Sequence, residues 1–158
     1  MAVRKISEVI HFGVGIAPVA DVFDSTQYSD VVNLQNFGKV AFVVFTGVGA
    51  TGTQTFTVEA CDDVVPTNVS AVAFYSRSYY NSDVPGALTS QASAGYTVTA
   101  GSNAIHVIEI DVEALIASGY KYARMKSVEV TNSPVLGGIL TMLLDPRSTE
   151  HVGLTTIV

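Results

Sequence analysis

The sequence predicts an all-β protein, an antiparallel β-sandwich or jelly roll with one short helix between two late strands. Three observations lead to this prediction. About eight strand-length runs recur at roughly even spacing along the chain. The alternation of strands and long helical patterns that is typical of a parallel sheet is missing. Finally, residues 104–144 follow the order strand, short helix, strand, turn and strand.

The short helix is predicted over residues 111–119, between strands at 104–110 and 120–130. Asp111 is a good N-cap residue, Glu113 adds negative charge to the first turn, and Gly119 can adopt the left-handed conformation that ends a helix. A helix of about two turns is too short to be stable alone. We therefore expect it to dock on a sheet.

Four further segments have strand character. Residues 39–46 form a continuous β-branched and aromatic run of strand length. A run that is apolar on both faces predicts a central strand buried on both faces. Residues 53–60 alternate strictly, with Phe56, Val58 and Ala60 predicted to point inward and Thr55, Thr57 and Glu59 toward solvent. Residues 71–80 are predicted to form one strand and residues 95–100 a short one.

The segment Gly47-Val48-Gly49-Ala50-Thr51-Gly52 matches the glycine pattern of dinucleotide-binding proteins and follows a strand. That motif works only where a helix begins immediately afterwards, because the helix N-terminus holds the pyrophosphate. Here an alternating, threonine-rich strand follows instead. The sequence therefore predicts a glycine-rich hairpin loop and no nucleotide site.

The chain divides into three parts. Residues 1–20 form a predicted N-terminal extended arm, residues 21–146 the sandwich domain and residues 147–158 a C-terminal tail. The arm has alternating apolar residues but no helical stripe, so it packs either on its own sheet or on a neighbouring subunit. Both alternatives remain open at the level of sequence.

Composition limits the kind of partner. The 158 residues are 48% hydrophobic and only 14% charged, so we expect part of the surface to be covered by another molecule. A net charge of −6 opposes direct nucleic-acid binding, which needs clustered Lys and Arg. Cys61 is the one cysteine, so no internal disulfide forms. No apolar run is long enough to cross a membrane, and residues 9–20 make a poor signal-peptide core, so we expect synthesis in the cytoplasm.

No catalytic, cofactor-binding or metal-binding residues are predicted. The histidines His11, His106 and His151 are widely separated and show no ligand spacing. Cys61 and His106 would be the one conceivable nucleophile and base, but nothing near Cys61 would activate its thiol. The acids Asp62, Asp63 and Asp83 are interpreted as solvated loop residues, and the six tyrosines between 75 and 122 as core or subunit contacts, with a carbohydrate site as the alternative.

Several of these segments together resemble the capsid cement or decoration proteins of tailed bacteriophages. The resemblance covers residues 47–146 and rests on four features of this sequence. They are Gly49 to Thr53 leading into Phe56 to Asp62, the strand Phe74 to Arg77, the strand end Ile108 to Asp111 with its helix, and the strand Gly119 to Met125. It implies a β-sandwich virion protein that binds the outside of the capsid, with the major capsid protein as its partner and no catalytic residues.

On this basis we expect a homodimer or homotrimer at the capsid exterior, with arm and tail residues between chains. The predicted interface residues are Ile10, Phe12, Ile16, Val152 and Leu154. Two alternatives remain: a head- or tail-fibre adhesion module that binds host-surface glycans, and a small hydrolase on a jelly-roll scaffold. The first would need an exposed aromatic cluster, and the second a cluster of histidine and carboxylate side chains.

Overall fold

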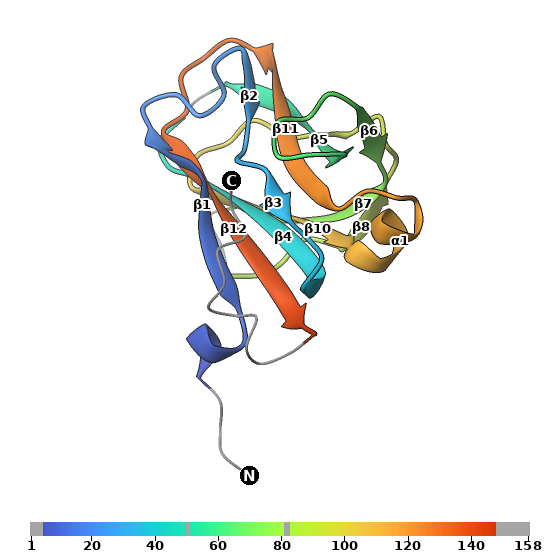
Figure 1. Ribbon diagram of the computed structural model, residues 1–158. Coiled ribbons are helices and arrows are strands. Elements are labelled where there is room, and N and C mark those ends of the chain that lie inside the picture. Colours follow the sequence, from blue (N-terminus) through green and yellow to red (C-terminus); the bar gives the residue numbers. More distant parts are fainter. Residues whose placement is uncertain (1–4, 50, 81–82, 148–158) are drawn as a thin grey trace.

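The computed structural model describes residues 5–49, 51–80 and 83–147. Two sheets pack face to face as a β-sandwich, and every strand pair in these residues is antiparallel, which confirms the predicted fold class (Figure 1). We name the sheets A and B. Sheet A has the strand order β1, β12, β4, β10, β7, β8. Sheet B has the order β2, β11, β5, β6, with β3 also paired to β11 and β9 to β5.

The bounds of the elements follow. Sheet A contains β1 (His11–Val19), β4 (Phe37–Thr46), β7 (Phe74–Tyr80), β8 (Thr89–Gln91), β10 (Ala104–Asp111) and β12 (Gly137–Pro146). Sheet B contains β2 (Thr26–Tyr28), β3 (Val32–Asn33), β5 (Thr53–Cys61), β6 (Val69–Val72), β9 (Tyr96–Thr97) and β11 (Tyr122–Thr131). The helices are the 3-10 turn η1 (Ile6–Glu8) and α1 (Val112–Ala117).

The core lies between the two sheets and is built from alternate strand residues. Phe42 and Ile108 from sheet A, and Phe56, Val58 and Met125 from sheet B, are fully buried there. Successive side chains on a strand point to opposite faces, so each of these strands contributes every second residue to the core. The predicted inward positions of β5 are therefore confirmed.

Strand β4 is central in sheet A, as predicted, but only one of its faces is fully covered. Val40, Phe42 and Val44 point inward and are fully buried. On the other face Val43 is half-buried and Phe45 is 60% exposed. The prediction of burial on both faces is wrong for this second face, because a two-layer sandwich has no third layer to cover it.

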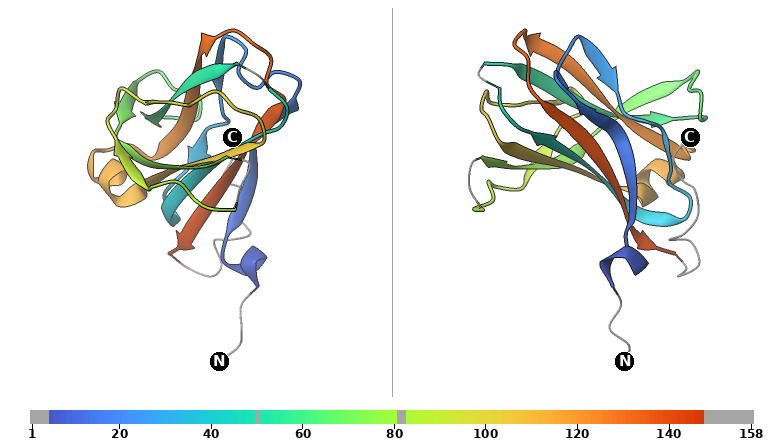
Figure 2. Two further views of the ribbon diagram at one scale, coloured as in Figure 1. Left: turned by 180° about the vertical axis from the view of Figure 1, so that it is seen from behind. Right: turned by 90° about the vertical axis from the view of Figure 1, so that its left-hand side faces the viewer.

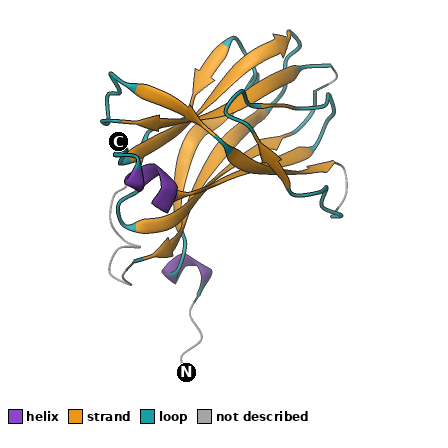
Figure 3. Ribbon diagram, turned by 90° about the vertical axis from the view of Figure 1, so that its right-hand side faces the viewer, coloured by secondary structure: helices purple, strands orange, loops and turns teal. Residues whose placement is uncertain are grey.

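Helix α1 connects β10 of sheet A to β11 of sheet B and closes one end of the sandwich (Figure 3). Its residues Val112 and Leu115 are buried in the core, and the helix contacts β4, so it is docked as expected. Gly119 has a φ of +90°, the predicted left-handed conformation. Asp111 occupies the N-cap position with extended backbone but makes no side-chain capping bond; it is also the last residue of β10, paired with Lys39.

Two predictions about connections are wrong, and both concern crossings between the sheets. Residues 71–80 do not form one strand: β6 ends at Val72 in sheet B, and β7 begins at Phe74 in sheet A. The loop after β4 is not a hairpin, since β4 belongs to sheet A and β5 to sheet B. Local alternation looks the same whether a chain stays in one sheet or changes sheets, so the pattern could not reveal these crossings.

Glycines in this crossing loop lie against residues that precede β12. A Cβ atom added to Gly49 would come within 2.8 Å of the Val135 side chain. A Cβ atom at Gly52 would overlap the carbonyl oxygen of Ser133. Gly49 and Gly52 are therefore needed for close packing of two chain segments, and the strand β5 rather than a helix follows them.

The N-terminal segment packs on its own sheet, one of the two alternatives left open by the sequence. Residues 11–19 form β1, which pairs with β12 along its length, and the two run side by side in the right-hand view of Figure 2. The Asp30 amide also donates to the Gly15 carbonyl oxygen across 3.0 Å, which links β1 to a connection of sheet B. Neither helix in the described residues is long and apolar enough to cross a membrane.

The glycine packing predicts a specific loss of stability. Gly52→Ala should lower the free energy of unfolding by about 1–3 kcal/mol, because backbone atoms must shift to accept the new methyl group. The measurement is the midpoint of urea unfolding at an unchanged m-value. Gly101→Ala is the control, since its Cβ would lie 3.6 Å from the Tyr80 ring, an ordinary contact. Equal midpoints for the two variants would contradict this account.

Candidate protein-contact surface

The one candidate nucleophile and base are not brought together. The His106 ring contacts Phe56 with 5.8 Å between ring centroids. Cys61 lies five residues further along the same strand β5, which corresponds to about 16 Å at 3.3 Å per residue. The imidazole therefore lies beside the middle of β5 and the thiol at its end, too far apart to exchange a proton directly.

Burial also makes the Cys61 thiol unreactive. Cys61 is fully buried, and its sulfur contacts the Glu59 carbonyl oxygen at 3.5 Å. Burial raises the pKa of the thiol to about 11, and the nearby Arg124 charge only partly opposes this shift. At neutral pH the side chain is therefore a thiol rather than the nucleophilic thiolate.

His106 is a buried residue of the sandwich interior. Its Nδ1 atom lies 2.8 Å from the Ser78 hydroxyl oxygen, to which it is hydrogen bonded, and its ring contacts Tyr80 and Tyr96. The residue is 2% exposed. Burial lowers the pKa of His106 to about 4, so the ring is neutral at physiological pH.

No group of three or more His, Cys, Asp or Glu side chains that could hold a metal ion occurs among the described residues. Asp62 instead stabilises the loop between β5 and β6. Its carboxylate accepts hydrogen bonds from the amide and side chain of Asn68 and from Thr67, at 2.8 to 3.1 Å. These bonds, those from Asn68 first, hold the pKa of Asp62 well below its usual range.

The tyrosines considered for a carbohydrate site are dispersed. Tyr75 and Tyr79 point away from the core on β7, while Tyr120 packs against the core beside α1. Tyr80 and Tyr96 lie together and line a hollow of about 370 Å³ that also includes Gln91. Tyr80 is exposed and Tyr96 is half-buried, so this pair is the one feature of the described surface that favours glycan binding.

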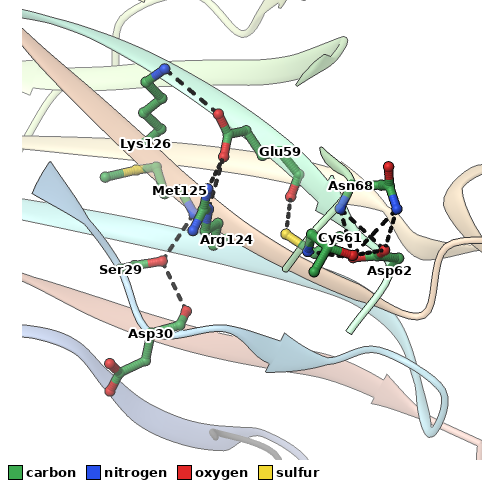
Figure 4. Close-up of polar contacts among 10 residues, drawn as sticks. Ser29, Asp30, Glu59, Cys61, Asp62, Asn68, Arg124, Met125 and Lys126 are labelled. Carbon is green, nitrogen blue, oxygen red and sulfur yellow. Dashed lines mark hydrogen bonds and ion pairs between the residues drawn. The ribbon is translucent and has the colours of Figure 1, made fainter. Parts of the chain in front are cut away.

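The outer face of sheet B is held by ionic contacts that the sequence analysis missed. Glu59, predicted to face solvent, is 7% exposed. Its carboxylate lies 2.7 Å from Arg124 Nη2 and 3.7 Å from Lys126 Nζ, and both cations point toward it in Figure 4. The Arg124 guanidinium also lies 4.1 Å from the centre of the Tyr28 ring. Because Arg124 is paired with Glu59 across β11 and β5, this contact depends on strand register and is invisible in the sequence.

The outer face of sheet A is apolar over several strands. The strand pairs place Val14 beside Leu140 and Leu140 beside Val43, with Phe12 beside Met142 in the next row. We call the following six residues the apolar face: Phe12, Val14, Val43, Phe45, Leu140 and Met142. The face continues onto β10, where Val107 lies beside Val43 and Ile105 beside Phe45. Contiguous exposed apolar surface of this kind marks sites of protein interaction.

The exposure of these side chains is large for apolar residues. Phe45 is 60% exposed, Val14 57%, Phe12 44% and Leu140 39%. Near Phe45 the face is hollowed into a shallow groove of about 460 Å³, whose lining includes Val14, Ile16 and Leu136. The groove contains no charged side chain among its lining residues, so it offers contact area but no catalytic groups.

The predicted interface residues lie in different places. Phe12 belongs to the apolar face. Ile10 is half-buried, and its amide donates to the Ile6 carbonyl oxygen of η1. Ile16 packs partly against the core while also lining the groove. Val152 and Leu154 lie outside the described residues.

Most of the apolar face was not found from the sequence. Val43, Phe45, Leu140 and Met142 belong to strongly apolar runs, which were interpreted as core strands. The signal that could have identified the face was that these runs are apolar at successive positions, and therefore on both faces of each strand. A two-layer sandwich buries one face of each strand, so a strand that is apolar on both faces must leave one of them uncovered.

Buried His106 predicts a pH-dependent stability. Its pKa is lower in the folded protein than in the unfolded chain, so unfolding takes up a proton between pH 6.5 and about 4. The free energy of unfolding is therefore unaffected by this group above pH 6.5, and it falls by about 3 kcal/mol as the pH drops to 4. Urea unfolding at several pH values measures this decline. The wild type should lose more stability than His106→Asn over the same pH range. A wild-type minus variant difference that is constant from pH 7 to pH 4 would contradict the prediction.

The Glu59 contacts predict a stability loss without any change of fold. Glu59→Gln keeps the side-chain shape but removes the charge that faces Arg124 and Lys126, and should cost about 1–3 kcal/mol. The exposed Glu113→Gln in α1 is the matched control and should change the free energy of unfolding by less than about 0.5 kcal/mol. Chemical unfolding of both variants provides the comparison. A cost at Glu59 no larger than that at Glu113 would show that the buried ion pair adds nothing.

Comparisons with known proteins add no family to this picture. No family model matches the chain, and no curated protein matches it. The features that bear on function are therefore the two outer faces of the sandwich. The face of sheet B carries ion pairs, and the face of sheet A is largely apolar.

Proposed function

We propose that the protein is a non-enzymatic virion structural protein that binds the outer surface of a phage capsid. In this role it stabilises the shell by bridging adjacent major capsid subunits. The observation that carries the proposal is the apolar outer face of sheet A, where Val14 and Phe45 are more than half exposed. Such a face supplies extended contact area for a protein partner.

The electrostatics of the chain agree with this role. With 14 acidic and eight basic residues, the chain is unsuited to bind packaged nucleic acid directly. Its acidic side chains are better placed on the outside of a particle than facing the genome. The buried, neutral His106 and the buried Cys61 thiol support a structural rather than catalytic use of the fold.

A protein that bridges capsid subunits stabilises the shell by mass action. A ligand that binds only the assembled lattice lowers the free energy of the assembled state, and therefore raises the temperature at which the shell opens. The packaged genome presses outward, so release of DNA reports that opening. Extended, weakly charged contact surface is what such a ligand requires.

Adhesion to host-surface glycans is the second candidate function, and the hollow beside Tyr80 and Tyr96 is the observation that favours it. Sugars are commonly bound by aromatic rings together with amide side chains, and Gln91 lies in this hollow. However, Tyr96 is half-buried and hydrogen bonded to Ser78 at 3.1 Å, which leaves Tyr80 as the exposed ring.

The cementing role predicts a difference in DNA release. Particles that lack the protein should release DNA at a temperature several degrees lower than complete particles, as followed with a DNA-binding dye. Adding purified protein back should restore the higher temperature. Equal release temperatures for the two kinds of particle would remove the cementing role, and glycan binding by the purified protein would then place the adhesion function first.

A further inference from the structure

A hollow of about 390 Å³ lies beside helix α1, where the chain crosses from β6 to β7. We call it the α1 hollow. The buried core residues that line it are Phe74, Ile110 and Leu115. Tyr75, Tyr120 and Asp111 line it as well, whereas no lysine or arginine does. Apolar walls with a few polar groups are typical of ligand-binding sites.

The carboxylate of Asp111 has no partner among the described residues. It makes no capping bond to α1 and forms no ion pair. Lys39, which lies beside it in the strand register, is paired with Asp145 instead, with 3.9 Å between Nζ and Oδ2. A carboxylate accepts several hydrogen bonds, so Asp111 can bind a donor from outside this chain.

The charges around Asp111 favour a cation. Asp111 also lines two further hollows, one together with Glu109 and the other at the start of α1. The charged residues of the three hollows are the acids Glu109, Asp111, Glu113 and Asp145 and the bases Lys39 and Arg147. Because acids outnumber bases, a positively charged group is attracted to this end of the sandwich.

An aromatic ring lies next to these carboxylates. Glu109 is paired with Tyr75 across β10 and β7, and Asp111 is the next residue of β10 on the same face. Tyr75 is 46% exposed and lines the α1 hollow together with Asp111. Arg77 of the same strand lines the hollow beside Tyr80 and forms no ion pair with any described acid.

The outer face of sheet B shows what such a ring and carboxylate bind. There the Arg124 guanidinium lies 4.1 Å from the centre of the Tyr28 ring, and its Nη2 atom lies 2.7 Å from the Glu59 carboxylate. A guanidinium suits this arrangement because it is planar, stacks on aromatic rings and binds a carboxylate with two parallel hydrogen bonds. The α1 hollow has the ring and the carboxylate, and no arginine of the described residues lines it.

We propose that the α1 hollow receives an arginine side chain of a protein partner, with the guanidinium between Asp111 and Tyr75 and the aliphatic stem against the apolar walls. The hollow lies on the β7 side of sheet A, whereas the apolar face lies on β1, β12 and β4. It therefore gives the protein a second attachment point, which bridging of two capsid subunits requires. This use rests on the proposed function, but arginine binding does not.

Titration of the purified full chain with N-acetyl-arginine amide, followed by NMR, tests the proposal. Amide signals of residues 73–75, 110–115 and 118–120 should shift to saturation, with a Kd on the order of millimolar. The uncharged isostere N-acetyl-citrulline amide should bind roughly tenfold more weakly or not at all. Asp111→Asn keeps a good N-cap residue and should weaken arginine binding by roughly tenfold.

Glu113→Gln is the matched control, because it removes one negative charge from α1 but does not line the α1 hollow, and it should change the Kd less than about twofold. Equal melting curves would show that both variants fold alike. Unsaturable shifts, equal binding of the citrulline probe or an unchanged Kd in Asp111→Asn would overturn the proposal. Arginine binding by a protein whose loss leaves the DNA-release temperature unchanged would keep the site and remove the cementing role, so the two failures are distinguishable.

Discussion

Strand β4 sets the constraint on which the rest of this structure depends, since it is apolar on both faces within a fold that has only two layers. Its inward residues Val40, Phe42 and Val44 meet sheet B and are fully buried. Its outward residues have no layer above them, and Phe45 is 60% exposed as a result. Exposed apolar area costs about 25 cal/mol per Å² relative to burial, so this face gains stability from any protein that covers it.

The two outer faces of the sandwich solve the same problem of strand alternation with different chemistry. On sheet B, Glu59, Arg124 and Lys126 form an ionic group, and threonines of neighbouring strands hydrogen bond at 2.7 to 2.9 Å. On sheet A the equivalent outward positions hold Val14, Leu140 and other apolar residues. Both faces have the same pleat and the same kind of neighbours, so they differ in composition alone: charged and hydroxyl side chains on sheet B, and mostly apolar side chains on β1, β12 and the middle of β4 in sheet A.

The interior polar groups are held in their neutral forms by burial. Burial keeps His106 neutral and Cys61 protonated, since transfer of either charged form into an apolar interior is costly. Both residues therefore contribute packing and hydrogen bonds rather than proton transfer. The glycines at 49 and 52 have a similar role, because they permit contact with the segment before β12.

The sequence by itself determined the fold class, most strand positions, the docked helix α1 and the inward side of β5, because alternation and helix-ending signals are local properties of a few residues. It also determined that the glycine-rich loop after β4 leads into a strand rather than a helix. Tertiary structure alone decided which sheet each strand joins. The break at Ala73, the crossing after β4, the place of β1 beside β12 and the burial of Glu59 under Arg124 all depend on pairing between residues far apart in the chain. The apolar face of sheet A belongs to the same class, because it exists only once β1, β12 and β4 lie side by side.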